Sequence, residues 1–99
     1  MANLCTNLFY ASSEHKQTID TIKTFIEHNF PDNWYSREDD DLIEAELASK
    51  WVFPTNLFEE LGRTLIHDDT LYMRCLSYEL YNEYACLSVY REGQWSIGV

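Results

Sequence analysis

The chain of 99 residues carries 17 acidic and 7 basic side chains, which gives a net charge of -10. Binding to nucleic acid or to an anionic membrane depends on cations that meet phosphates, so both functions are disfavoured. A hydrophobic content of 45% with 15% aromatic residues is too high for a disordered chain. The length fits a single domain, residues 1–99.

The first 30 residues predict a strand followed by a helix. From Asn3 to Tyr10, apolar residues occur on both faces of a period-two alternation, which is typical of a central strand. Ser12-Ser13-Glu14 then offers a hydroxyl cap and an acid for the first turn of a helix. This helix should end near Asn29, because Pro31 disfavours helical geometry in the residue before it. Its single apolar face consists of Ile19, Ile22, Phe25, Ile26 and Phe30.

A short aromatic segment and an acidic turn come next. Residues 33–36 include Trp34 and Tyr35 and predict a short strand at a sheet edge. Six carboxylates then fall within residues 37–47. Four of them are consecutive and form a charged turn: Glu38, Asp39, Asp40 and Asp41.

Residues 42–53 are open to two interpretations. In a strand, Glu44, Glu46 and Lys50 share one face, and the other face consists of Ile43, Ala45, Leu47, Ser49 and Trp51. The segment is also rich in helix formers, and the acidic turn could cap a helix. The even spacing of the polar residues favours the strand. In a strand, Glu44 and Glu46 extend the acidic surface beyond the turn, whereas a helix would separate them.

The second half of the chain predicts a helix and three further strands. The helix opens after Pro54, with Asn56 as its cap and Glu59 in the capping-box position. Gly62 marks the point where this helix is expected to fray. Its apolar face consists of Leu57, Phe58, Leu61 and Leu65. Alternation then predicts strands at residues 70–78 and 85–90, and a short Gly-containing turn leads into a returning strand at 95–99.

The element order is strand, helix, strand, strand, helix, strand, strand, strand. A sheet with two amphipathic helices is most stable when both helices cover one face. We therefore expect an α+β fold: a ferredoxin-like two-layer sandwich with a mainly antiparallel sheet, two helices on one face and an added C-terminal hairpin.

Three short segments resemble the Api92-like proteins. Met1-Ala2-Asn3-Leu4-Cys5-Thr6-Asn7 is similar to the M-A-N-x-C-x-N start of that family, although Leu4 stands where its members usually have Trp. Glu46–Trp51 followed by Pro54 resembles the family's strand that ends in Trp before Pro, and Ala85–Trp95 resembles its closing hairpin. The resemblance implies a ferredoxin-like domain in an accessory protein of a phage, plasmid or other mobile element. It implies no catalytic residues.

The sequence contains no pattern that predicts catalysis, a cofactor or a metal site. The acidic turn lacks the Gly and the distal Glu of an EF-hand loop. His67 beside Asp68 and Asp69 could form a base with its orienting acid, but neighbouring residues in a turn usually point apart. A second surface is suggested by five tyrosines of the C-terminal third. Cys5, Cys75 and Cys86 form no CxxC pair and are expected to be buried free thiols.

These observations predict a non-enzymatic, acidic protein-binding module. The sharpest hypothesis is a phage or mobile-element inhibitor of the anti-CRISPR or anti-restriction type, which occupies a basic, nucleic-acid-binding surface of a host defence complex. The expected contact residues are Glu38, Asp39, Asp40, Asp41, Glu44 and Glu46, with Trp34 and Tyr35 as aromatic anchors. Two alternatives stay open: a small metal-dependent regulator and a homodimer. Because the N-terminus lacks the features of a signal peptide, the expected location is the cytoplasm of the bacterial host.

Overall fold

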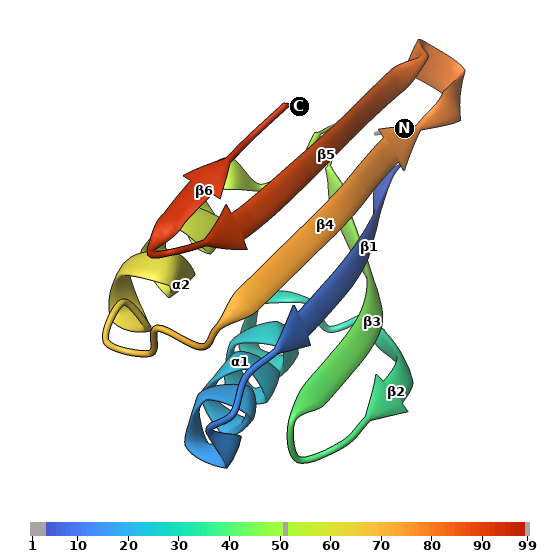
Figure 1. Ribbon diagram of the computed structural model, residues 1–99. Helices are drawn as coiled ribbons and strands as arrows, with labels where there is room; N and C mark the ends of the chain where they lie inside the picture. Colours follow the sequence, from blue (N-terminus) through green and yellow to red (C-terminus); the bar gives the residue numbers. More distant parts are fainter. Residues whose placement is uncertain (1–3, 51, 99) are drawn as a thin grey trace.

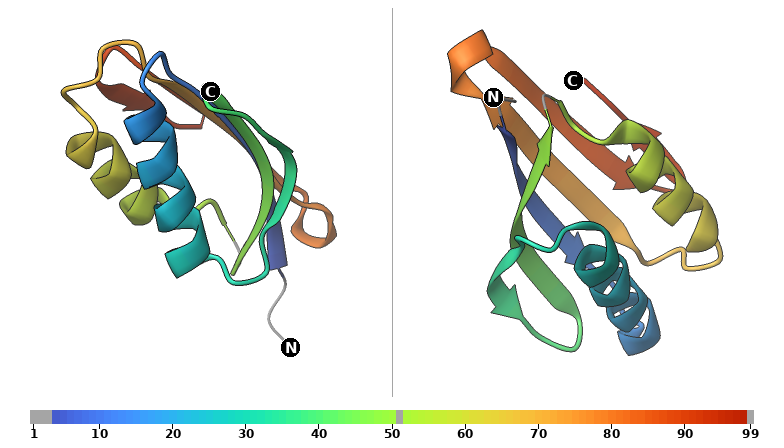
Figure 2. Two further views of the ribbon diagram at one scale, coloured as in Figure 1. Left: turned by 90° about the horizontal axis from the view of Figure 1, so that it is seen from below. Right: turned by 180° about the vertical axis from the view of Figure 1, so that it is seen from behind.

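The computed structural model describes residues 4–50 and 52–98. Predictions that involve Met1-Ala2-Asn3, Trp51 or Val99 lie outside the described residues. The chain folds into one antiparallel sheet with strand order β2-β3-β1-β4-β5-β6, and two helices cover one of its faces (Figures 1 and 2). The elements are β1 (Leu4–Ser12), α1 (Lys16–Asn29), β2 (Trp34–Glu38), β3 (Leu42–Lys50), α2 (Thr55–Thr64), β4 (Tyr72–Glu79), the short 3-10 helix η1 (Leu80–Asn82), β5 (Tyr84–Arg91) and β6 (Gln94–Ser96).

The predicted α+β, ferredoxin-like arrangement is confirmed. Strands β2, β3, β1 and β4 form the ferredoxin-like part of the sheet, and β5 and β6 extend it beyond β4. The first strand lies inside the sheet, between β3 and β4, as its two apolar faces predicted. Residues 42–50 form a strand, so the strand interpretation is correct and the helix interpretation is wrong. The helices lie behind the sheet in Figure 1 and in front of it in the right-hand view of Figure 2.

The hydrophobic core lies between the sheet and the two helices. Phe58 of α2 is at its centre and is fully buried. Its ring centroid lies 5.4 Å from that of Phe9 in β1, 5.4 Å from that of Phe25 in α1 and 5.1 Å from that of Phe53. One aromatic cluster therefore joins both helices to the central strand. The apolar face predicted for α1 is buried at Ile19, Ile22 and Ile26.

The start of α1 differs from the prediction. The helix begins at Lys16, with His15 in the N-cap position and no side-chain cap of its own. Ser12 is instead the last residue of β1, where it pairs with Leu42 and Tyr72. The N–H of Ser13 donates to the carbonyl of Asp41 at 3.1 Å, which keeps the chain extended for one more residue. Sheet pairing therefore delays the helix beyond the predicted Ser12-Ser13-Glu14 cap.

The second helix also differs from the prediction at two points. It begins at Thr55, so Asn56 lies inside the helix and does not cap it. Gly62 does not mark fraying, because the helix continues to Thr64 and Gly62 is buried. A Cβ atom at this position would lie 2.8 Å from Cε2 of Tyr90 and 3.0 Å from Nε1 of Trp95. The glycine thus allows α2 to approach the C-terminal hairpin closely.

The C-terminal hairpin has a shorter returning strand than predicted, and it is hydrogen-bonded to α2. Its returning strand β6 ends at Ser96, and the turn is formed by Glu92 (φ 52°) and Gly93 (φ 78°). Both angles suit the two-residue turns that connect twisted antiparallel strands. The indole Nε1 of Trp95 donates to the carbonyl of Phe58 at 2.7 Å, which ties the hairpin to α2.

Within the described residues, every helix is too short or too polar to cross a membrane.

Candidate functional site

The hairpin of β2 and β3 carries all of the predicted contact residues. It occupies one edge of the sheet, with β2 as the outermost strand (Figure 1). Trp34 pairs with Glu46 in register, and Glu44 lies two residues before Glu46 on the same face. This face is the side of the sheet opposite the helices, which we call the open face. Glu44 and Glu46 therefore share one face, as the strand interpretation predicted, and the structure also places Trp34 beside them.

Two of the six predicted acids are engaged in ion pairs. The carboxylate of Glu38 lies 2.9 Å from Nζ of Lys23 on α1, and that of Asp39 lies 2.9 Å from Nε of Arg37. The turn also has a structural role that the sequence did not suggest, because the N–H of Asp39 donates to the carbonyl of Leu42 at 2.8 Å. Part of the charge in the turn is thus neutralised within the molecule.

The other four acids form the surface that we call the acidic strip: Asp40, Asp41, Glu44 and Glu46. Among the ion pairs found in residues 4–50 and 52–98, none involves a member of this strip. Asp40 and Asp41 are exposed at the tip of the hairpin, and Glu46 is exposed farther along β3. The strip therefore contains three exposed acids and the half-buried Glu44 along one strand and its turn.

Trp34 and Tyr35 point to opposite faces of the sheet. The Trp34 side chain is 68% exposed on the open face. The Tyr35 ring packs against the core on the helix side, and its hydroxyl lies 3.5 Å from a carboxylate oxygen of Glu27. Burial and the negative charges of Glu27 and Glu38 raise the pKa of Tyr35 to about 12. Of the two predicted aromatic anchors, Trp34 alone lies beside the acidic strip.

A shallow depression of about 280 Å³ lies between Trp34 and the acidic strip. It is lined by Leu8, Phe9, Trp34, Ser36, Glu44, Ala45 and Glu46. Apolar surface from Leu8 and Trp34 thus adjoins two carboxylates. This combination suits a lysine or arginine side chain, whose methylene stem prefers apolar contact while its head prefers a carboxylate.

An exposed apolar row crosses the open face and was not predicted as a surface. The register places Leu8 of β1 beside Leu76 of β4, and Leu76 beside Leu87 of β5. Their exposed fractions are 42%, 44% and 36%. The sequence feature that could have indicated this row is the presence of apolar residues on both faces of these strands. That feature was used to predict a central position for β1, and it did not show that one face of the sheet is uncovered.

The tyrosines of the C-terminal third do not form one surface. Tyr90 is buried, and its hydroxyl donates to the carbonyl of Gly62 at 3.3 Å. The Tyr84 hydroxyl accepts a hydrogen bond of 3.2 Å from the N–H of Phe53. Tyr72 and Tyr78 are half-buried, and Tyr81 is 89% exposed on η1. The side chains are therefore divided between the core, the sheet and a connecting turn.

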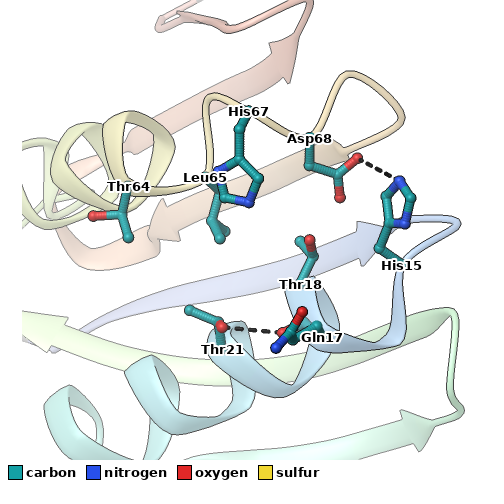
Figure 3. Close-up of a pocket in the computed structure, with 8 residues that line it drawn as sticks. All are labelled: His15, Gln17, Thr18, Thr21, Thr64, Leu65, His67 and Asp68. Carbon is teal, nitrogen blue, oxygen red and sulfur yellow. Dashed lines mark hydrogen bonds and ion pairs between the residues drawn. The ribbon is translucent and has the colours of Figure 1, made fainter.

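A larger cavity, of about 580 Å³, lies between the first turn of α1 and the end of α2 (Figure 3). His15, His67 and Asp68 all line it, but Asp68 approaches His15 and not its neighbour His67. The distance between Nε2 of His15 and Oδ1 of Asp68 is 3.8 Å. The pairing of His67 with Asp68 as a base and its orienting acid is therefore not formed in this arrangement.

Asp68 is a buried carboxylate held by hydroxyl groups. Ser13 Oγ donates to one of its oxygens, and the N–H and Oγ1 of Thr70 donate to the other at 2.9 and 2.7 Å. Burial raises the pKa of Asp68, but the hydrogen bonds from Ser13, Thr70 and Thr18 outweigh it and hold the pKa well below its ordinary value. Since Ser13 donates directly to the acid and not to a histidine, this group does not have the geometry of a nucleophile with its base.

The three cysteines are free, and they lie on the helix side of the sheet. Cys5 and Cys75 are buried, and Cys86 is partly buried. Burial raises the pKa of the Cys75 thiol to about 12, and burial also raises that of Cys5. Both thiols stay protonated near neutral pH, which does not favour nucleophilic chemistry. In the part of the chain that the structure describes, His, Cys, Asp and Glu side chains form no group of three suited to a metal ion.

Comparisons with protein-family models, with curated proteins and with solved structures found no match to this chain.

Proposed function

We propose that this protein is a non-enzymatic binding module whose acidic strip occupies a basic, nucleic-acid-binding surface of another protein. The observation that carries the proposal is the position of the strip: none of its four carboxylates forms an ion pair in the described residues, and two of them, Glu44 and Glu46, lie beside the exposed ring of Trp34. Aromatic side chains anchor protein interfaces, and complementary charge accelerates association. A row of carboxylates on an extended strand also presents negative charge to a basic groove, as the phosphates of a nucleic acid do.

The depression beside Trp34 adds a specific contact to this proposal. A lysine or arginine of the partner would lay its stem on Leu8 and Trp34 and direct its charged head to Glu44 and Glu46. The partner class that follows is a protein that binds DNA or RNA through exposed cations. The resemblance to Api92-like proteins favours an accessory protein of a phage or mobile element. Together with the acidic strip, it supports an inhibitor of a bacterial host defence complex, of the anti-CRISPR or anti-restriction type, that acts in the host cytoplasm.

The test is affinity capture from a bacterial host lysate with the wild-type protein and two charge-matched variants. Glu44→Lys with Glu46→Lys reverses two charges in the strip, and Glu60→Lys with Asp69→Lys reverses two exposed charges away from it. We expect a basic, nucleic-acid-binding protein to be captured by the wild type and by the control but not by the strip variant. The captured protein should release from nucleic acid when wild-type protein is added.

Two further results of this experiment test the proposal. Capture should weaken when the wash contains high salt, because salt screens attraction between exposed charges. Equal capture by the strip variant, with circular dichroism spectra that show both variants folded, contradicts the proposal.

A further inference from the structure

The open face carries positive charge opposite the acidic strip. Arg74 of β4 lies over the ring of Tyr10, with its Cζ atom 4.1 Å from the ring centroid, and 5.9 Å from that of Tyr72. The Cζ atom of Arg91 in β5 lies 5.8 Å from the same Tyr72 centroid. Among the ion pairs of the described residues, neither arginine takes part. Two guanidinium groups that share one ring repel each other, so the pair is a ready site for carboxylates.

The sheet register places matching side chains at several pairs of positions on the two sides of β1. Tyr10 of β1 lies between Glu44 of β3 and Arg74 of β4 in one row. The next row contains Leu8 at the same central position, with Glu46 and then Trp34 on one side and Leu76 and then Leu87 on the other. At equal distances from β1, an acidic residue thus lies opposite a basic one in the first row, and the outermost positions of the second row are both apolar. The inner positions of the second row, Glu46 and Leu76, are the pair that does not match.

We propose that a second copy of this chain packs on the open face, with a two-fold axis that runs along β1. Such an axis exchanges the two sides of the sheet, so that β3 of one copy meets β4 of the other and β2 meets β5. Glu44 of each copy then faces Arg74 of the second copy, and Trp34 faces Leu87. Leu8 and Tyr10 meet their own equivalents at the axis. The hairpin tip with Asp40 and Asp41 approaches Arg91 of the second copy.

The size of the face is adequate for this interface. The Cα atoms span 39 Å and 24 Å along their two longer dimensions. A standard interface buries about 800 Å² per partner, and two packed sheets keep their strand directions within about 30° of each other, which an axis along β1 allows. The dimer brings Asp40, Asp41 and Glu44 of each copy close to the arginines of the other copy, whereas Glu46 faces Leu76. These contacts offset part of the repulsion expected from the net charge of -10 on each chain.

This inference does not rest on the proposed function, because it needs no other protein. If both hold, the second copy covers the surface that a basic partner requires, and the two compete. The dimer would then be the resting form, and a partner with more cations than Arg74 and Arg91 would displace the second copy.

The test is sedimentation equilibrium of single variants and of their mixture. In Glu44→Arg, the new arginine faces Arg74 of the second copy, and in Arg74→Glu, Glu44 faces a new acid. We expect each variant alone to be a monomer under conditions in which the wild type is a dimer. In an equimolar mixture, Arg at position 44 of one variant faces Glu at position 74 of the other, and the unchanged Arg74 faces the unchanged Glu44. The mixture should therefore recover the dimer.

The matched control is Arg63→Glu, which makes the same charge change at an exposed position of α2, on the far side of the sheet. It should leave the dimer intact. A wild-type protein that stays monomeric at millimolar concentration overturns the inference, and so does a mixture of the two variants that stays monomeric. Capture of a basic partner is measured separately with the strip variant, so failure of the dimer and failure of the proposed function give different results.

Discussion

Asp68 is a buried carboxylate near the start of α1, a helix that has no side-chain cap of its own. His15 provides no side-chain cap, and the first turn of the helix contains no acid. Asp68 reaches this helix end from the loop between α2 and β4, with Ser13 and Thr70 as its hydrogen-bond donors. A carboxylate near a helix N-terminus is favourable for the exposed N–H groups and for the helix dipole.

We expect Asp68→Asn to lower the free energy of unfolding by about 1–3 kcal/mol at neutral pH, because an amide cannot accept all of the hydrogen bonds that the carboxylate accepts. Asp69→Asn, at the exposed neighbouring position, should change it little. Urea titrations of both variants measure the difference. Equal stability of Asp68→Asn and the wild type would show that the network contributes nothing.

The same carboxylate gives the stability a defined pH dependence. Its pKa in the folded state lies below the ordinary value of 3.8, so the folded protein holds the proton less tightly than the unfolded chain. The stabilisation is therefore complete well above pH 3.8 and is lost as the pH falls through the folded-state pKa. The difference in unfolding free energy between wild type and Asp68→Asn should shrink in acid. A difference that stays constant as the pH is lowered would contradict this assignment.

At the scale of elements, α2 and the C-terminal hairpin depend on the absence of a side chain at Gly62. Alanine is favoured over glycine in a helix interior by about 1 kcal/mol. The contacts with Tyr90 and Trp95 should reverse this preference, since Tyr90 is buried and cannot move freely. We expect Gly62→Ala to destabilise the protein by about 1–3 kcal/mol. Thr64→Ala, two residues later and exposed, is the control and should be neutral or stabilising in thermal unfolding.

The alternation of apolar and polar residues was the strongest sequence signal for the strands. Features that depend on tertiary contacts were not predicted. Alternation identified β1, β3 and β4 of the ferredoxin-like sheet, including residues 42–50, although that segment is rich in helix formers, whereas β2 was predicted from its aromatic residues. Both predicted helix caps were wrong. Ser12 pairs in the sheet and α2 begins directly after Pro54, and neither feature can be predicted from the neighbouring residues alone. For the candidate site, the strand placed Glu44 and Glu46 correctly. The ion pair of Glu38 with Lys23 and the packing of Tyr35 on the core depend on the position of α1 against the sheet. They could therefore not be predicted from the sequence.

At the scale of the whole molecule, net charge is the dominant electrostatic term. With a charge of -10, mutual repulsion among the acids opposes the compact state. The ion pairs that salt would weaken join exposed groups and contribute about 0–1 kcal/mol each. We therefore expect the melting temperature to rise when sodium chloride is added at neutral pH, with the wild type gaining more than the Glu44→Lys and Glu46→Lys variant. A melting temperature that falls with salt would show that local pairs outweigh the repulsion.

The network around Asp68 joins two segments that lie far apart in the sequence. Ser13 and Asp68 are separated by 55 positions, so this contact closes a loop that contains α1, β2, β3 and α2. Contacts of such long range form late unless they belong to the folding nucleus. The beginning of α1 should then stay frayed in the transition state, even where the middle of the helix is formed. Stopped-flow measurements on Asp68→Asn should show faster unfolding at an unchanged refolding rate.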